Sequence, residues 1–155
     1  MRKTFLILVV LLLSSCATKY NPPTDMTNVA TINYEVNVDA ALGYTSSLYI
    51  KKAHSNNSCY SDGELVAFIN GGNPFGGSTK NPKNVPFKVM EKSFFCVNIA
   101  PANVGGQRGC EKLISFVAKP SNSYKIVATW GNYSCSTHIL NLSKDVPVEY
   151  DEENL

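Results

Sequence analysis

The chain has 155 residues, of which 14 are basic and 12 acidic, and its formal net charge is +2 at pH 7. Two of the basic residues, Arg2 and Lys3, precede an apolar run at the amino terminus, and Arg108 is the one arginine in the rest of the chain. Beyond its first residues the chain is neutral and lacks the clustered positive charge that nucleic-acid binding needs, which excludes that class of function.

The first residues have the three-part layout of a secretory signal. The positively charged start is followed by an apolar run over residues 5–13 and by two serines before Cys16. A nine-residue helix would be about 14 Å long, less than half of the roughly 30 Å hydrocarbon core of a bilayer. The pattern therefore predicts a signal peptide over residues 1–15 that is removed, and not a permanent transmembrane anchor.

The sequence Leu13-Ser14-Ser15-Cys16 resembles the lipobox of bacterial lipoproteins. The resemblance implies cleavage before Cys16, a diacylglycerol on the Cys16 thiol and acylation of the new amino terminus. Two or three acyl chains bind a membrane durably, because each buried methylene contributes about 0.8 kcal/mol. The family's inner-membrane retention signal has aspartate where this chain has Ala17, which implies the outer membrane of a Gram-negative cell. The alternative is an ordinary secretory signal in which the cysteine is incidental.

Residues 17–29 are polar, show no periodicity and include Pro22-Pro23. This composition predicts a flexible tether over residues 16–29, with a reach of about 45 Å when fully extended. Residues 30–148 are then enough for one domain with its own core. The acidic end, residues 149–155, is expected to be solvated and partly disordered.

The domain begins with a clear strand pattern. In residues 31–38, Ile32, Tyr34 and Val36 fall on one face and polar residues on the other, which predicts a half-buried strand. Seven further short segments are rich in β-formers and separated by turn residues: 47–52, 64–69, 85–90, 93–99, 113–118, 123–130 and 135–142. We therefore predict an all-β fold, an antiparallel β-sandwich of seven to eight short strands.

The segments 113–118 and 123–130 flank Pro120-Ser121-Asn122 and are predicted to form a hairpin. Together with Cys110 and Cys135 they resemble uncharacterised small lipoprotein families with an immunoglobulin-like or transthyretin-like sandwich. Those families imply no reaction.

Assigning one of the five cysteines to lipid leaves four in an exported chain, where two disulfides are expected: Cys59, Cys96, Cys110 and Cys135. Reflecting the chain about residues 120–122 brings Cys110 close to Cys135, which favours that bond and leaves Cys59 to pair with Cys96. The same argument applied about Asn103 pairs Cys96 with Cys110, so this alternative stays open.

Two histidines lie near cysteines, His54 five residues before Cys59 and His138 three residues after Cys135. A structural zinc site normally includes a closely spaced cysteine pair, and none is present. We therefore expect disulfides, no metal and no cofactor.

The glycine-rich segment 71–77 follows an apolar strand but lacks the Gly-Lys-Ser/Thr sequence of a phosphate-binding loop. A connection between strands is the preferred interpretation, and a binding loop is the alternative. Four lysines follow it, which either solvate an edge strand or face an acidic partner or lipid headgroups: Lys80, Lys83, Lys88 and Lys92. Five aromatic residues either pack in the core or offer surfaces for stacking on a glycan: Tyr44, Tyr49, Phe75, Trp130 and Tyr133.

No catalytic constellation of nucleophile, base and carboxylate is apparent, so we predict a protein that is not an enzyme. The leading hypothesis is a lipoprotein bound to the outer membrane through lipid on Cys16, which presents loops to a protein partner in the cell envelope. A module that binds a soluble ligand or glycan through loop 71–77 is the second hypothesis. A hydrolase that depends on His54 or His138 is the third.

Overall fold

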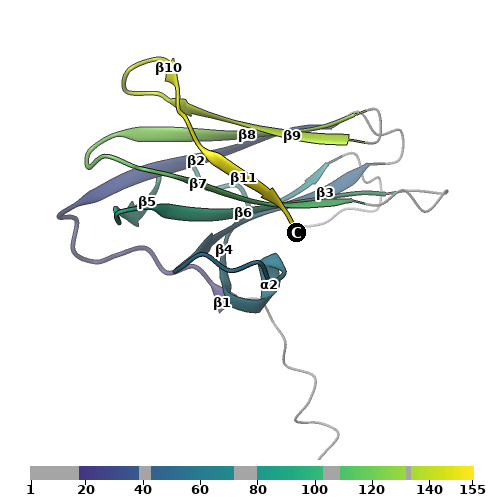
Figure 1. Ribbon diagram of the computed structural model, residues 1–155, viewed down its shortest axis with the longest axis horizontal. Helices are drawn as coiled ribbons and strands as arrows, with labels where there is room; N and C mark the ends of the chain where they lie inside the picture. The colour runs from purple at the N-terminus through teal and green to yellow at the C-terminus, as the bar shows by residue number, and fades with distance from the viewer. Residues whose placement is uncertain (1–17, 39–42, 72–79, 103–108, 132–133) are drawn as a thin grey trace, which may run out of the picture.

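The computed structural model describes residues 18–38, 43–71, 80–102, 109–131 and 134–155, which form two β-sheets facing each other (Figure 1). The six-stranded sheet contains, in spatial order, β1 (Thr18–Lys19), β4 (Gly63–Gly71), β3 (Tyr44–Lys51), β6 (Ser93–Pro101), β7 (Cys110–Phe116) and β11 (Asp151–Asn154). The five-stranded sheet contains β10 (Val146–Pro147), β9 (Ser134–Asn141), β8 (Ser123–Gly131), β2 (Val29–Val38) and β5 (Val85–Lys88). The predicted all-β sandwich is confirmed.

Each of the eight predicted segments coincides with one of the strands β2 to β9. Strand β2 is half-buried, as its alternating sequence predicts, because Ile32 and Tyr34 are buried while Glu35 and Asn37 are exposed. Three short strands that the sequence did not indicate, β1, β10 and β11, extend the edges of the two sheets.

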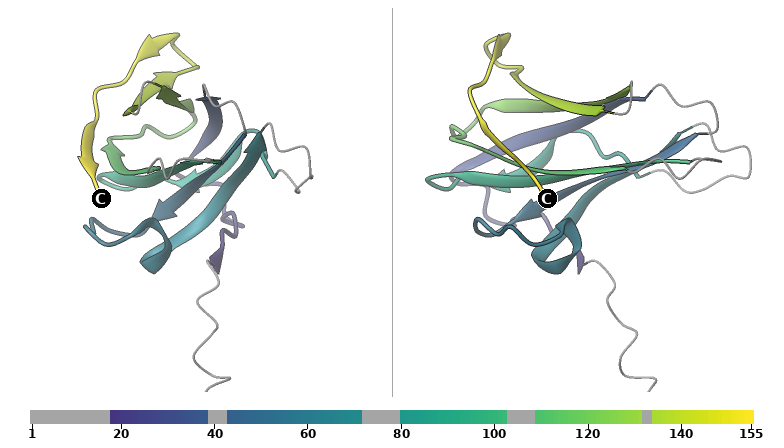
Figure 2. Two further views of the ribbon diagram at one scale, coloured as in Figure 1. Left: turned by 90° about the vertical axis from the view of Figure 1, so that its right-hand side faces the viewer. Right: turned by 45° about the vertical axis from the view of Figure 1, so that its right-hand side comes forward.

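The sheets are mixed and not purely antiparallel. Strand β2 pairs in parallel with β8, from Thr31 opposite Ser123 to Val38 opposite Trp130. Of the strands that lie between β2 and β8 in sequence, β5 is at the edge of the same sheet, and the others belong to the six-stranded sheet: β3, β4, β6 and β7. Strands β2 and β8 can therefore be neighbours. Figure 2 shows the two layers from the side.

The predicted hairpin of residues 113–118 and 123–130 is wrong. Strand β7 pairs with β6 and β11, whereas β8 pairs with β2 and β9, so the intervening turn crosses from one sheet to the other. Phe116 and Tyr124 then face each other across the core, with ring centroids 5.0 Å apart. The same turn residues suit a turn within a hairpin and a turn that connects the two sheets. Burial of both aromatic rings favours the connection between the sheets.

The core between the sheets is built around aromatic side chains from both layers. Phe95 of β6 lies 5.3 Å from Phe87 of β5 and 5.7 Å from Phe116 of β7, measured between ring centroids. A second, small cluster consists of Tyr49, Cys59 and Cys96. Because Cys96 lies between the core residues Phe95 and Val97 in β6, this second cluster is on the outer face of the six-stranded sheet.

Both favoured disulfides are present, Cys59–Cys96 and Cys110–Cys135, and the Cys96–Cys110 alternative is thereby excluded. Cys110 and Cys135 do not meet across a hairpin as the reflection about residues 120–122 predicts, because Cys110 in β7 and Cys135 in β9 belong to different sheets. The bond therefore connects the two layers of the sandwich.

The acidic end was expected to be partly disordered, and this expectation is wrong for residues 151–154. They form β11, which pairs antiparallel with β7 and remains exposed. The chain passes from β10, at the edge of the five-stranded sheet, to β11 at the edge of the other sheet (Figures 1 and 2). Glu152 contacts both the Lys112 ammonium and the Thr137 hydroxyl, so the segment bridges the two layers.

Candidate functional site

The segment expected to be a free tether lies on the domain from residue 18 onward. Thr18 and Lys19 pair in parallel with Glu64 and Leu65 of β4. The Tyr20 amide then donates to the Leu65 carbonyl at 3.0 Å, and the Tyr20 hydroxyl donates to the Pro86 carbonyl at 2.9 Å. Partial burial, with the nearby Glu64 charge, raises the pKa of Tyr20 to about 12. Residues 18–20 are therefore part of the folded domain and not of a flexible tether.

The later part of this segment is held by a lysine from β5. The Lys88 ammonium lies 2.7 Å from the Asp25 carboxylate and 2.7 Å from the Thr27 carbonyl. Asp25 also accepts a hydrogen bond from the Thr27 amide at 2.9 Å. The hydrogen bonds from Lys88 and Thr27 hold the pKa of Asp25 well below its usual range. The amino-terminal segment thus joins β4 of one sheet to β5 of the other.

A hollow of about 230 Å³ lies beside the amino-terminal segment. Its apolar lining includes Tyr20, Pro23, Ile50 and Met90. Its polar lining consists of Asn21, Lys51, Lys52, Glu64 and Lys88. The hollow therefore belongs to the end of the molecule that contains β1.

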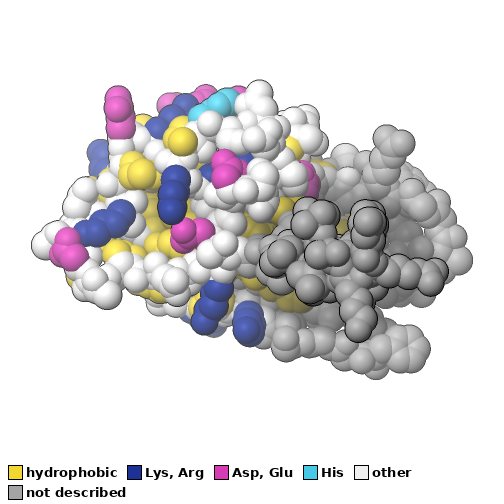
Figure 3. All heavy atoms as spheres, turned by 90° about the horizontal axis from the view of Figure 1, so that it is seen from below, with side chains coloured by type: hydrophobic (Ala, Val, Ile, Leu, Met, Phe, Trp, Pro, Cys, Tyr) yellow, Lys and Arg dark blue, Asp and Glu magenta, His cyan; other side chains and the backbone are white. Residues whose placement is uncertain are grey.

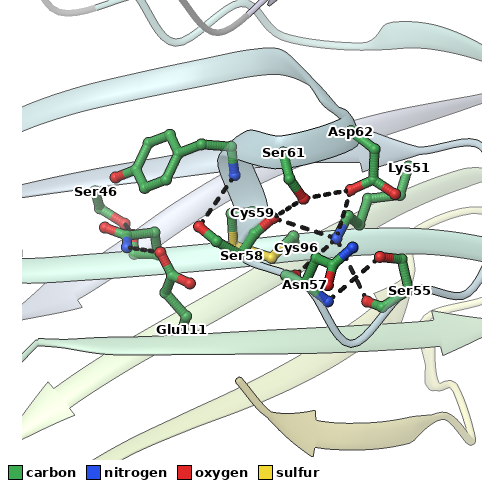
Figure 4. The surroundings of a disulfide bond; sticks show 12 residues. Ser46, Lys51, Ser55, Asn57, Ser58, Cys59, Ser61, Asp62, Cys96 and Glu111 are labelled. Atoms are coloured by element: carbon green, nitrogen blue, oxygen red, sulfur yellow. Dashed lines mark hydrogen bonds and ion pairs between the residues drawn. A yellow bond between two sulfur atoms is a disulfide. The ribbon is translucent and has the colours of Figure 1, made fainter. Parts of the chain in front are cut away.

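Lys51, at the end of β3, is fully buried on the outer face of the six-stranded sheet. Its ammonium donates to the carbonyls of Asn57 at 3.0 Å and of Ser55 and Ser58 at 3.4 Å, and it lies 2.9 Å from the Asp62 carboxylate (Figure 4). Although partial burial opposes the effect, the hydrogen bond from Lys51 lowers the pKa of Asp62. One cation thus fixes the loop after β3.

The short helix α2 (Cys59–Asp62) follows this loop and covers the outer cluster. The Ser58 hydroxyl accepts from the Tyr60 amide at 3.4 Å, and the disulfide to Cys96 fastens the helix to β6. Gly63 begins β4 directly afterwards, and a Cβ added there would lie 2.3 Å from the Cys59 carbonyl oxygen. Only glycine fits where the chain leaves the helix for the sheet.

A second depression, a polar groove of about 620 Å³, lies where β2 and β8 meet the segment before β5. Asn33 and Asn84 form two hydrogen bonds, of 3.0 and 2.8 Å, and Asn81 donates to the Tyr34 carbonyl at 3.1 Å. A salt bridge of 3.0 Å between Lys125 and Glu35 lines another part of the groove. The apolar residues in the lining are Val36, Ile69 and Leu142.

The four predicted surface lysines do not form one cationic patch. Lys88 binds Asp25, and Lys92 forms an ion pair with Asp151 of β11. Lys83 lines the polar groove, and Lys80 is exposed where its backbone bridges to Phe68. Lys88 and Lys92 therefore form ion pairs with the protein's own acidic residues.

The predicted stacking aromatics are mostly unsuited to that role. Tyr49 and Trp130 are buried, and the Tyr44 ring lies against Gly71. Burial raises the pKa of Tyr49 to about 12, since the phenolate would be poorly solvated there. Phe75, Tyr133 and positions 72–77 of the glycine-rich segment lie outside the described residues.

The two histidines lie apart from the cysteines that suggested a metal site. The His54 ring nitrogen is 2.9 Å from the Glu153 carboxylate of β11, and His138 is exposed on β9. Cys59 and Cys135 are both in disulfides, so neither offers a thiolate. Within the described ranges, no group of three or more His, Cys, Asp or Glu side chains is arranged to hold a metal ion.

Sequence reasoning missed three residues whose side chains join different parts of the fold: Lys51, Tyr20 and Glu152. No family model matches the chain, and no curated protein is significantly similar to it. In the part of the chain that the structure describes, no helix is long and apolar enough to span a membrane.

Proposed function

We propose that the protein is a lipoprotein of the bacterial outer membrane, anchored through lipid on Cys16, with a structural or protein-binding role and no enzymatic one. The observation that carries this proposal is the sequence Leu13-Ser14-Ser15-Cys16 at the end of an apolar run. The two disulfides support it, because bonds such as Cys110–Cys135 are typical of oxidising compartments outside the cytoplasm and rare within it.

The test of the anchor is a comparison of the wild-type chain with Cys16→Ser in a bacterial host. The wild type is expected to incorporate labelled palmitate and to sediment with the outer membrane, whereas the variant takes up no label and is not retained there. Equal distribution of the two chains between membrane and soluble fractions contradicts the proposal.

The protein-binding role is tested separately by cross-linking in intact envelopes. A photoreactive residue in place of Lys144, in the exposed turn between β9 and β10, is expected to yield a discrete cross-linked protein. Recovery of only lipid and bulk porins from this position, and from a second exposed site at Ser121, counts against the role.

The polar groove supports a second candidate function, the binding of a soluble glycan. Its volume is in the range of small-molecule sites, and its amide and charged groups, which can hydrogen-bond to hydroxyl groups, lie beside apolar side chains as in such sites. Lys83→Ala and Lys125→Ala are expected to abolish binding on a glycan array, while Lys144→Ala leaves it unchanged. An array without binding by the wild-type chain contradicts this candidate.

A further inference from the structure

The attachment of the amino-terminal segment determines how far the domain is from its lipid anchor. Only Ala17 separates Cys16 from Thr18, which is hydrogen-bonded into the sheet as part of β1. Successive Cα atoms are about 3.8 Å apart, so the Cα atom of Cys16 is within about 8 Å of that of Thr18. A free tether over residues 16–29 would instead allow about 45 Å.

From this we infer that the domain lies directly on the membrane surface, with β1, helix α2 and the hollow of about 230 Å³ at the level of the lipid headgroups. The inference rests on the lipidation proposed above. It adds an orientation, because the end of the molecule that contains β1 then faces the bilayer.

The elements around β1 identify the surface that meets the lipid. Glu64, the partner of Thr18, comes two residues after the end of α2. Figures 1 and 2 show β1 and α2 at the same end of the molecule, on the side away from β8 and β9. Strands β8 and β9 of the five-stranded sheet are therefore directed away from the membrane.

Large apolar side chains are exposed near this end. Tyr60 of α2 is 48% exposed, and Met90, which lines the hollow, is 38% exposed. Met26 is 62% exposed and follows Asp25, which binds the hollow-lining Lys88. Tyrosine suits the membrane interface because its ring is apolar and its hydroxyl polar.

Two of the lysines that line the hollow are paired within the protein. Lys88 binds Asp25, and Lys52 lies 3.4 Å from Glu64. On the part of the lower face that the described residues form, basic and acidic side chains are interspersed with exposed apolar atoms and form no single basic field (Figure 3). The contact with lipid therefore depends on the anchor and on apolar groups, and is expected to tolerate salt and neutral lipids.

The orientation is tested with the full lipidated chain in vesicles of phosphatidylethanolamine and phosphatidylglycerol. One fluorophore is attached through an added cysteine in Tyr60→Cys, Met90→Cys or Ser136→Cys, the last being exposed on β9 of the five-stranded sheet. Lipids with a nitroxide on the headgroup are expected to quench the fluorophore at positions 60 and 90 and to leave position 136 bright, in low and in high salt.

A second variant separates attachment from orientation. A Gly-Ser insert of about ten residues between Ala17 and Thr18 leaves β1 unchanged but adds a mean reach of roughly 17 Å. Quenching at positions 60 and 90 is expected to fall toward that at position 136. Quenching that is unaffected by the insert shows that the distance is not set by the short connection and overturns the inference.

Flotation with the vesicles distinguishes failure of the inference from failure of the proposed anchor. A chain that floats but shows no quenching at positions 60 and 90, or equal quenching at all three positions, overturns the orientation and leaves the lipid anchor intact. A chain that does not float contradicts the lipidation itself, and the orientation with it.

Discussion

Lys51 stabilises the outer face of the six-stranded sheet through the oxygen atoms around its ammonium group. Three are carbonyl oxygens of the loop between β3 and α2, and one belongs to Asp62. Burying a cation is favourable only when its hydrogen-bonding capacity is filled in this way. Alternation within β3 places position 51 on the outer face, but it cannot foresee that the following loop folds back over it. The site was therefore not predictable from local pattern.

Replacing Lys51 with methionine is expected to lower the free energy of unfolding by about 3 kcal/mol, because the loop carbonyls and Asp62 lose their shared donor. The matched control is Lys52→Met, since the side chain of Lys52 is 87% exposed and its removal is expected to change stability by less than about 0.5 kcal/mol. Urea unfolding of both variants measures the difference. Equal effects of the two substitutions contradict the role assigned to Lys51.

Asp25 provides a pH-dependent contact in the amino-terminal segment. Its pKa is depressed below the ordinary value of 3.8 by hydrogen bonds from Lys88 and Thr27. A depressed pKa means that the contact contributes fully above the ordinary value and is lost as the pH falls through the folded-state value. The NMR shift of the Thr27 amide is expected to titrate with a midpoint well below 3.8, and not at all in Asp25→Asn. A midpoint at or above 3.8 contradicts the contact.

The acidic composition of β11 does not indicate that this segment is a strand. Its acidic sequence is typical of a solvated end, yet Glu152 contacts Lys112, which precedes it by 40 residues and is only 7% exposed. No local signal connects two residues so far apart. Strands β2 to β9 were predictable because alternation and β-forming composition are local signals, whereas the assignment of each strand to one sheet or the other was not.

The contacts of β11 lead to a paired prediction at neighbouring positions. Glu152→Ala leaves Lys112 buried without a carboxylate and is expected to cost about 2 to 4 kcal/mol. Glu153→Ala removes only a surface contact with His54, where both side chains are about half exposed, and is expected to cost less than about 0.5 kcal/mol. Thermal unfolding of the two variants side by side checks this order, and the reverse order refutes it.

At the scale of the whole molecule, the two sheets are joined along one side by a covalent bond and by the carboxyl-terminal segment. Cys110–Cys135 links β7 to β9, and Glu152 contacts Lys112 of β7 and Thr137 of β9. The number and spacing of the cysteines predicted this bond but not that it joins the two sheets. Spacing along the chain does not reveal to which sheet each strand belongs.

Replacing both Cys110 and Cys135 with alanine is expected to lower the free energy of unfolding by about 3.5 kcal/mol, the value of the chain-entropy model for a loop closed over 25 residues. The sandwich is expected to persist, because the aromatic core does not depend on this bond. Denaturant unfolding of the double variant, with circular dichroism to check the strand content, measures both. Unchanged stability contradicts a linking role.

The proposed anchor and the orientation of the domain both depend on the chemical state of Cys16, because lipid on this residue supplies the anchor and fixes the membrane-facing end. The most direct measurement is mass spectrometry of the amino-terminal peptide of the protein isolated from bacterial membranes. We predict a peptide that begins at Cys16 and has the added mass of a diacylglycerol and an amide-linked acyl chain. A mature chain that begins elsewhere, or a Cys16 with an unmodified thiol, contradicts the lipid anchor and the orientation that depends on it.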